Sequence, residues 1–246
     1  LFRRYDCRLQ FGGSDQWGNI TAGVDLVRRT ESEQVHAFTT PLLLKSDGEK
    51  YGKTEGGTVW LDPDLTSPYA FYQYWFNVDD ADVGMLLRRL TFMSHAAITE
   101  LDAATRDAPA RRLAQRALAA EVTGLVHGQQ AVAQAEAASQ AVFGRADLTD
   151  LTPQTLAGVM STVPHVVVDP SADAPTIADL LAETGLTPSK GAARRAASEG
   201  GVYVNNVRVH DADSEVDRSA LLHGRWLVLR RGRRTVAGVD MGGGPA

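Results

Sequence analysis

The stretch 6–27 constrains the fold most, because an alternating segment, a glycine pair and an amphipathic segment follow one another directly. Apolar residues alternate with polar ones over 6–11, which predicts a β-strand. The glycine pair 12–13 would end that strand, and Ser14 or Asp15 would cap the helix that follows. In α/β proteins, ligands bind where a strand ends beside a helix N-terminus with unbonded N–H groups. The expected buried face of this helix consists of Ile20, Val24 and Val27.

Two polar side chains, Asp15 and Gln16, would project into such a site. A carboxylate can accept hydrogen bonds from two ribose hydroxyls, and an amide can donate to a carboxylate or phosphate oxygen. Plain helix capping by Asp15 is the alternative that these residues alone leave open.

A second ligand-binding signal is the Gly-rich loop 45–57, which follows an apolar segment, 35–44, with the composition of a buried strand. Within the loop, 50–54 reads Lys-Tyr-Gly-Lys-Thr. Two ammonium groups, a hydroxyl and flexible backbone N–H groups are what a polyphosphate needs. The loop is not a Walker P-loop, since three residues rather than four separate Gly48 from Gly52. A phosphate loop of another kind and an ordinary surface loop both stay open at this point.

The single cysteine, Cys7, excludes an internal disulfide and favours a reducing, cytoplasmic compartment. At a strand position, Cys7 is expected to be a buried, small hydrophobic residue. No apolar run is long enough for a transmembrane helix, so no membrane partner is expected. The net charge is −7 over 1–174 but +2 over 175–246, which predicts a basic C-terminal module on an acidic body. The chain enters structured-looking sequence directly at Leu1, and we expect further sequence upstream.

Residues 65–145 predict a helical domain. Ser67 followed by Pro68 marks a helix start, and six aromatic residues lie within 69–76. Further helices are expected over 79–89, from Ser94, over 109–126 and over 129–143. Five arginines in this stretch could contact RNA phosphates, and exposure to solvent alone is the alternative: Arg88, Arg89, Arg111, Arg112 and Arg116.

Prolines and small polar residues make 146–174 read as a linker, with one short helix expected over 153–160. A compact α/β pattern begins after it. The elements expected there are a helix from 177, a helix over 190–198 capped by Ser189, a hairpin over 202–209 that turns at Asn205-Asn206, and a strand over 226–229.

The run 12–20, Gly-Gly-Ser-Asp-Gln-Trp-Gly-Asn-Ile, resembles the tyrosine- and adenylate-binding stretch of bacterial tyrosyl-tRNA synthetases. The segment 50–54 is similar to that family's form of the class I signature Lys-Met-Ser-Lys-Ser, with Tyr51 where Phe or Met is more usual. The order and separation of the two motifs also fit the family.

The resemblance implies a role for each matching residue. Lys50, Lys53 and Thr54 would stabilise the charge that develops on the ATP phosphates. Asp15 would bind the adenylate ribose. The other implied contacts are Gly13, Leu42 and Leu43 with ATP or adenylate, Gln16 with adenylate and tyrosine, and Gln10 with tyrosine.

The C-terminal module resembles the S4 RNA-binding fold, through a Ser-Lys-x-x-Ala-Arg-Arg helix, a Gly-Gly-Val segment and a hairpin. The resemblance implies that Lys190, Arg194 and Arg195 contact RNA. The expected fold is therefore mixed α/β. It comprises part of a Rossmann-like class I catalytic domain over 1–64, an α-helical domain facing the tRNA anticodon arm over 65–145, the linker 146–174, and a small S4-like α/β domain over 175–246.

The implied reaction joins tyrosine to ATP as tyrosyl-adenylate and then transfers the tyrosyl group to tRNA(Tyr). Mg²⁺ would accompany ATP without a dedicated metal site, and a homodimer would form through upstream catalytic sequence. None of the six histidines lies in the class I His-x-Gly-His signature, so the chain alone is expected not to form tyrosyl-adenylate. The alternatives are a non-catalytic S4-type RNA-binding protein and a relative of tryptophanyl-tRNA synthetase.

Overall fold

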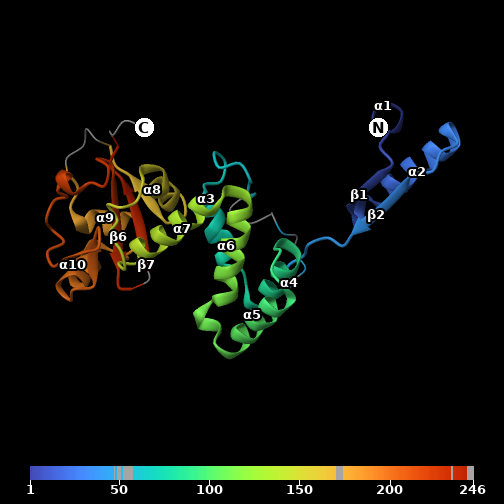
Figure 1. Cartoon of the computed structure of the whole chain (residues 1–246). Coiled ribbons are helices and arrows are strands. Elements are labelled where there is room, and N and C mark those ends of the chain that lie inside the picture. Colours follow the sequence, from blue (N-terminus) through green and yellow to red (C-terminus); the bar gives the residue numbers. More distant parts are fainter. Residues whose placement is uncertain (47, 49–50, 52–57, 170–173, 234, 243–246) are drawn as a thin grey trace. The chain divides into compact units, whose positions relative to one another are not determined.

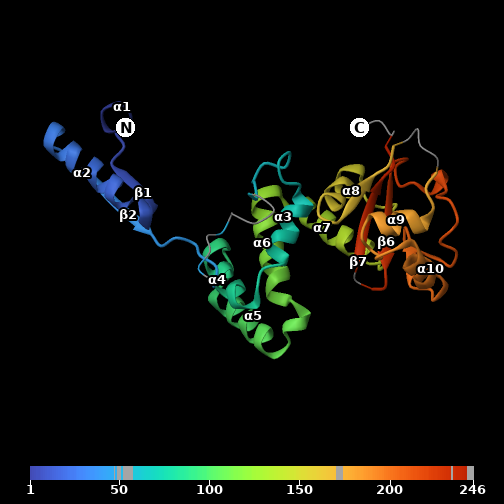
Figure 2. The same cartoon turned by 180° about the vertical axis from the view of Figure 1, so that it is seen from behind.

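The computed structural model describes residues 1–46, 48, 51, 58–169, 174–233 and 235–242. Its packing separates a first unit, Leu1–Thr58, from a second unit, Val59–Ala246. Figures 1 and 2 show the elements of each unit from opposite sides. Lys50, Lys53 and Thr54 lie outside the described residues. Within the described part, no helix combines the length and apolar character needed to cross a membrane.

The first unit is a parallel strand pair joined by a crossover helix. Its elements are α1 (Phe2–Tyr5), β1 (Leu9–Gly13), the short 3-10 helix η1 (Ser14–Gln16), α2 (Trp17–Glu31) and β2 (His36–Thr40). The pairing register runs from Leu9 opposite His36 to Gly13 opposite Thr40. Figure 1 shows α2 packed beside both strands.

The prediction of a strand over 6–11 was wrong in its bounds. The strand begins at Leu9 and continues through Gly12 and Gly13, because both glycines pair with β2 instead of ending the strand. Cys7 therefore precedes the strand and is only partly buried. Pairing with a distant segment decided these bounds.

The second unit begins with helices α3 (Pro68–Phe76), α4 (Asp80–Leu90), α5 (His95–Asp107), α6 (Leu113–His127), α7 (Gln129–Val142) and α8 (Pro153–Met160). The Ser67 hydroxyl accepts a hydrogen bond from Ala70 N, and the Ser94 hydroxyl accepts one from Ala97 N, so both predicted caps are confirmed. The short helix expected over 153–160 is confirmed as well.

The predicted helix over 109–126 is broken at Arg112. A 3-10 turn, η2 (Pro109–Arg111), precedes Arg112, whose φ of 50° lies in the left-handed region. The Arg112 guanidinium donates hydrogen bonds to the carbonyls of Phe76, at 2.7 Å, and Val78, at 3.3 Å. Phe76 is the last residue of α3 and Val78 follows it, and carbonyls at a helix end lack partners within the helix. A tertiary contact thus accompanies the break.

The C-terminal part combines two helices, α9 (Ile177–Glu183) and α10 (Lys190–Ser198), with a mixed sheet. The strands are β3 (His165–Val167), β4 (Val202–Val204), β5 (Val207–Val209), β6 (Trp226–Arg231) and β7 (Thr235–Asp240), in the spatial order β3-β7-β6-β4-β5. The predicted hairpin turn is confirmed, with φ of 47° at Asn205 and 66° at Asn206.

Strands β3 and β7 were not expected from the sequence. β3 lies within the predicted linker and joins the sheet parallel to β7. Leu148, Leu151 and Leu156, also within 146–174, are buried in the core.

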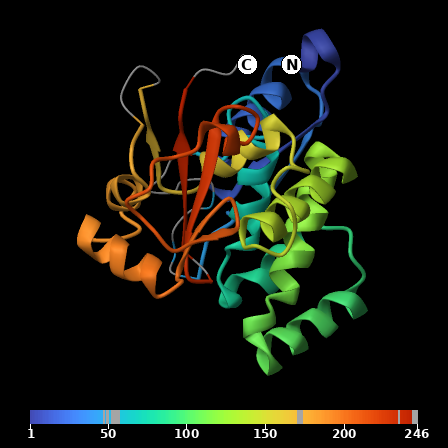
Figure 3. The same ribbon diagram turned by 90° about the vertical axis from the view of Figure 1, so that its left-hand side faces the viewer.

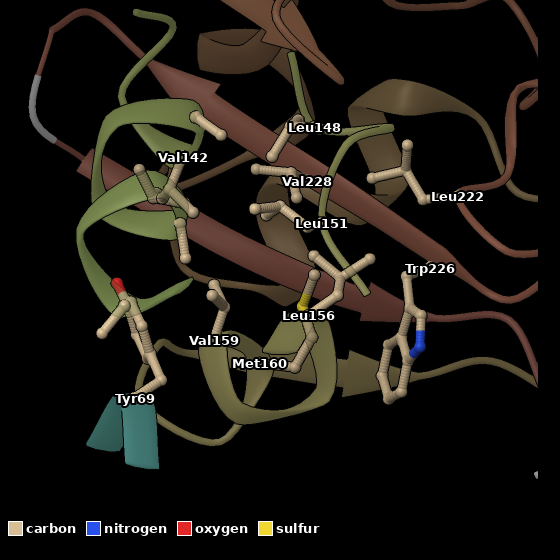
Figure 4. Close-up of a cluster of buried hydrophobic side chains, with 14 of the residues drawn as sticks. Tyr69, Val142, Leu148, Leu151, Leu156, Val159, Met160, Leu222, Trp226 and Val228 are labelled. Carbon is tan, nitrogen blue, oxygen red and sulfur yellow. The ribbon is translucent and has the colours of Figure 1, made fainter. Parts of the chain in front are cut away.

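Both faces of the sheet are buried, through alternate residues of β6. Trp226 and Val228 pack with α8, together with Leu156, in one apolar cluster (Figure 4). Leu227 and Leu229 pack with α9 and α10 in a second cluster. Figure 3 shows the orange helices and the yellow helix on opposite sides of the red strands. One strand therefore joins two cores.

Leu156→Ala should destabilise the second unit by about 2–5 kcal/mol, because Leu156 is fully buried between helix and sheet. Urea unfolding followed by tryptophan fluorescence measures the loss. Val167→Ala is the control, since Val167 is 71% exposed. Equal midpoints for the two variants would contradict this packing.

The acid stability of the second unit should depend on His127, whose ring packs edge-on against Phe71 with 4.9 Å between centroids. Burial lowers the pKa of His127 in the folded state. The unfolded chain then takes up the proton first, so stability is lost as pH falls through about 6.5. His127→Phe should remove this pH-dependent loss of stability, because phenylalanine does not titrate.

Urea unfolding of both proteins between pH 7.5 and 5 measures the effect. As pH falls, the free energy of unfolding of the unchanged chain should decrease relative to that of His127→Phe. A difference that does not change with pH would contradict the assignment.

Candidate functional site

The carboxyl ends of β1 and β2 meet at one edge of the strand pair. Gly13 and Thr40 are register partners there. The chain leaving Gly13 turns through η1 into α2, and the chain leaving Thr40 continues to Leu42 and Leu43. No side chain caps α2, so the expected capping by Ser14 or Asp15 was wrong. A turn of 3-10 helix, η1, occupies Ser14–Gln16, so α2 begins at Trp17.

Close packing at Gly13 brings Asp15 and Leu42 together. A Cβ atom added to Gly13 would lie 2.7 Å from Asp15 Oδ1 and 3.0 Å from Leu42 Cδ2. Both atoms belong to side chains, so a residue with a Cβ atom at this position would displace the Asp15 carboxylate. Glycine at this position therefore permits a polar carboxylate and an apolar side chain from two segments to share one edge. Asp15 is exposed there.

Gln16 and Gln10 are placed by the same strand. A Cβ atom on Gly12 would lie 3.4 Å from Gln16 Cβ, and Gln16 Oε1 accepts a hydrogen bond from Asn19 Nδ2 at 3.2 Å. Gln10 shares a strand face with Gly12, because side chains alternate along a strand. The exposed amide of Gln10 and that of Gln16 thus belong to one side of β1.

Tyr51, the described residue inside the 50–54 motif, lies beside the segment that follows β2. Its N–H donates a hydrogen bond to the Leu43 carbonyl at 3.3 Å.

No group of three or more His, Cys, Asp or Glu side chains is placed to hold a metal ion among the residues that the structure describes.

The second candidate site is helix α10. Its alanines Ala193, Ala196 and Ala197 are buried, so Lys190, Arg194 and Arg195 lie on the outer side. The Ser189 hydroxyl accepts from Ala192 N, which confirms the predicted cap. The three basic residues expected to contact RNA thus share one helix whose opposite side is packed on the core.

Two of these cations already have carboxylate partners. Lys190 pairs with Asp179, and Arg194 Nε lies 2.8 Å from Asp213 Oδ1. Lys190, with the Thr176 hydroxyl and backbone N–H, lowers the pKa of Asp179 to about 2. The basic side chains are 61% and 54% exposed, so they remain accessible to a competing anion.

Sequence reasoning missed Asp179 and Asp213 as partners of this helix. Asp179 carries a local signal, since it forms a capping box with Thr176 at the start of α9. Its pairing with another helix has no such signal. Asp213 lies in the loop after β5 and meets Arg194 only in the folded unit.

Comparison with known proteins identifies two families along the chain. Residues 2–144 match the family described as tRNA synthetases class I (W and Y). Residues 155–237 match the tyrosine–tRNA ligase SYY-like C-terminal domain. The first match contains the Gly13 edge, and the second contains α10.

The chain is 55% identical over 244 residues to a tyrosine–tRNA ligase of Thermobifida fusca, covering 97% of this chain and 56% of the relative. A tyrosine–tRNA ligase of Streptomyces avermitilis is 54% identical over 245 residues, covering 99% of this chain and 57% of the relative. The chain thus spans little more than half the length of these relatives.

Among solved structures, a C-terminally truncated mitochondrial tyrosyl-tRNA synthetase of Coccidioides posadasii is similar, with a TM-score of 0.44 and 36% identity. That match covers 52% of this chain and 38% of the solved chain. From the two family matches and the relatives that align along nearly all of its length, the chain belongs to the tyrosyl-tRNA synthetase family.

Proposed function

We propose that the protein takes part in tyrosine–tRNA ligation, in which ATP activates tyrosine to tyrosyl-adenylate and the tyrosyl group passes to tRNA(Tyr). Family membership supports the reaction class. The observation that carries the proposal is the close approach of Gly13, Asp15 and Leu42 at the carboxyl ends of two parallel strands. Ligands of α/β proteins bind at this kind of edge.

In this proposal, each group has a task that suits its chemistry. Asp15 accepts hydrogen bonds from the ribose hydroxyls, while the Leu42–Leu43 backbone contacts the adenine ring. Gln10 and Gln16 orient the tyrosine, and Gln16 also contacts the α-phosphate region. Lys50, Lys53 and Thr54 stabilise the charge on the leaving pyrophosphate, which grows as the tyrosine carboxylate attacks the α-phosphate.

A carboxylate nucleophile needs no general base, so placement and electrostatics are sufficient for the activation step. Mg²⁺ enters with ATP as part of the substrate. A homodimer formed by the catalytic domain is the proposed assembly, and the division at 64, 145 and 174 is the proposed domain plan.

For RNA binding, the proposed contact surface of the C-terminal module is α10. Lys190 and Arg194 would exchange their carboxylate partners for RNA phosphates, and Arg195 would add a third contact. Release of counterions from RNA favours this exchange. The helical part, 65–145, would face the anticodon arm.

Gly13→Ala should lower activity while Gly18→Ala should not. The test protein joins the upstream segment of the Thermobifida fusca relative ahead of Leu1. A Cβ atom at position 13 would lie 2.7 Å from Asp15 Oδ1 and so displace the Asp15 carboxylate, whereas one at position 18 meets nothing within 4 Å. Tyrosine-dependent pyrophosphate exchange should fall roughly 10–100-fold for Gly13→Ala. Equal rates for the two variants would contradict the proposed ribose site.

The 246-residue chain by itself should show no tyrosine-dependent pyrophosphate exchange, because the His-x-Gly-His signature of class I enzymes is absent from its sequence. The joined protein described above is the positive control. Substantial exchange by the chain alone would mean that its own residues are sufficient for activation.

Replacing Lys190 and Arg194 together by alanine should weaken tRNA(Tyr) binding roughly tenfold and lower the salt dependence by about two ions. The control is Arg28→Ala with Arg29→Ala, which removes the same charge from α2. Filter binding at several salt concentrations measures both quantities. Asp213→Asn should tighten binding, because Arg194 then loses its carboxylate partner. Unchanged salt dependence in the α10 variant would count against this surface.

A further inference from the structure

A tyrosine in the sheet of the second unit lies between two arginines of the neighbouring strands. Tyr203 of β4 is the register partner of Arg208 on β5 and of Arg230 on β6. The three side chains therefore share one face of the sheet, the face that β6 buries further along through Val228. None of the sites described above uses this tyrosine.

Both arginines contact the tyrosine itself. Arg208 Nη2 donates a hydrogen bond to the Tyr203 hydroxyl oxygen at 3.1 Å, and Arg208 Cζ lies 5.6 Å from the ring centroid. Arg230 Cζ lies 3.9 Å from the same centroid. One cation thus holds the phenol oxygen, while the other covers the aromatic ring.

Packing fixes both guanidinium groups. Arg230 is only 8% exposed, and its Nη1 donates to the Gly232 carbonyl at 2.7 Å. A Cβ atom on Gly144 would lie 3.0 Å from Arg230 Nη2, so the glycine leaves room for this guanidinium. Arg208 passes beside Gly200, where an added Cβ atom would lie 3.4 Å from Nη1. The two cations are therefore in place around the phenol before any reagent arrives.

The charge around Tyr203 is positive. Among the ion pairs of the described residues, none includes Arg208, Arg230 or Arg233. The hydrogen bond from Arg208, together with the charges of these three arginines, lowers the pKa of the Tyr203 phenol. A cation beside a phenol stabilises the phenolate, which is the nucleophilic form.

Three other tyrosines of the described residues provide a comparison. Tyr69 and Tyr72 are buried, and burial raises the pKa of both phenols. Tyr5 is 67% exposed, and Arg4 Cζ lies 5.5 Å from its ring centroid. Among the hydrogen bonds of the described residues, none runs from an arginine to the Tyr5 hydroxyl. Tyr5 therefore has access and a nearby cation but lacks the hydrogen bond that Tyr203 accepts.

We propose that Tyr203 is a site of covalent modification by aryl sulfonyl fluorides. Its hydroxyl oxygen attacks the sulfur atom, a new O–S bond replaces the S–F bond, fluoride leaves, and the phenol proton passes to water. Nothing is oxidised or reduced. The guanidinium groups stabilise the negative charge on the phenol oxygen and on the departing fluoride. The inference rests neither on the proposed ligase reaction nor on the α10 surface.

Labelling of the whole chain with benzenesulfonyl fluoride tests the proposal. Peptide mapping by mass spectrometry measures the labelling rate at each residue. Tyr203 should be labelled about tenfold faster than Tyr5, because a charge-assisted hydrogen bond supports its anion. Equal rates at the two tyrosines, or adducts at other residues but not at Tyr203, would overturn the proposal.

Substitutions at Arg208 test the part played by the cation. Arg208→Gln should slow the labelling of Tyr203 about tenfold, whereas Arg208→Lys, which keeps the charge, should slow it less. The matched control is Arg89→Gln, which removes an exposed arginine of α4 outside this cluster. If Tyr203 is labelled as fast in Arg208→Gln as in Arg89→Gln, the guanidinium does not activate the phenol and the proposal fails.

A comparison in urea separates the folded geometry from the local sequence. Thermal melting first checks that the variants are folded, which is expected because Arg208 is exposed and outside the core. In unfolding urea the neighbouring strands no longer hold their arginines beside Tyr203, so its faster labelling relative to Tyr5 should vanish. A preference for Tyr203 that survives unfolding would contradict the assignment to strand pairing.

Discussion

Alternate side chains of β6 pack into two apolar clusters, and the arrangement of the second unit depends on this two-sided burial. Trp226 and Val228 face the cluster that contains α8, whereas Leu227 and Leu229 face α9 and α10. A strand buried on both sides ties the helices on its two faces to one register, since a shift of one residue would exchange the faces. Helix α10 is positioned by its packing on this sheet.

In the first unit, Gly13 governs the packing at the end of β1. An added Cβ atom would lie 2.7 Å from Asp15 Oδ1 and 3.0 Å from Leu42 Cδ2, so a larger residue would displace the Asp15 carboxylate. Phe11 and Phe38 stack on the strand pair with centroids 5.3 Å apart and stay 68% and 45% exposed. The candidate edge thus depends on close packing around Gly13, while much of the aromatic surface of the pair is not covered within this unit.

Local signals predicted many of the elements. The helix at 153–160, the caps at Ser67 and Ser189 and the hairpin at 202–209 depend on neighbouring residues, and all are confirmed. The resemblance to tyrosyl-tRNA synthetases also located the stretch that forms the Gly13 edge. Strand β3 escaped prediction because its partner, β7, is distant in sequence. Strand β7 also pairs with its neighbour β6, so distance alone does not explain why β7 was missed. The helix break at Arg112 escaped because its contacts, the carbonyls of Phe76 and Val78, are distant in sequence.

The sequence by itself determined the family, the mixed α/β class, and the residue types and spacing of the Gly13 edge and of α10. These properties follow from interactions within a few residues and from motif order. Only the tertiary structure decided that Lys190 and Arg194 meet Asp179 and Asp213. It alone gathered Arg116 of α6 and Arg145 with Arg230 and Arg233 of the β6–β7 hairpin around one cavity. Charges are long-range and their partners are chosen by chain packing, which no local pattern encodes.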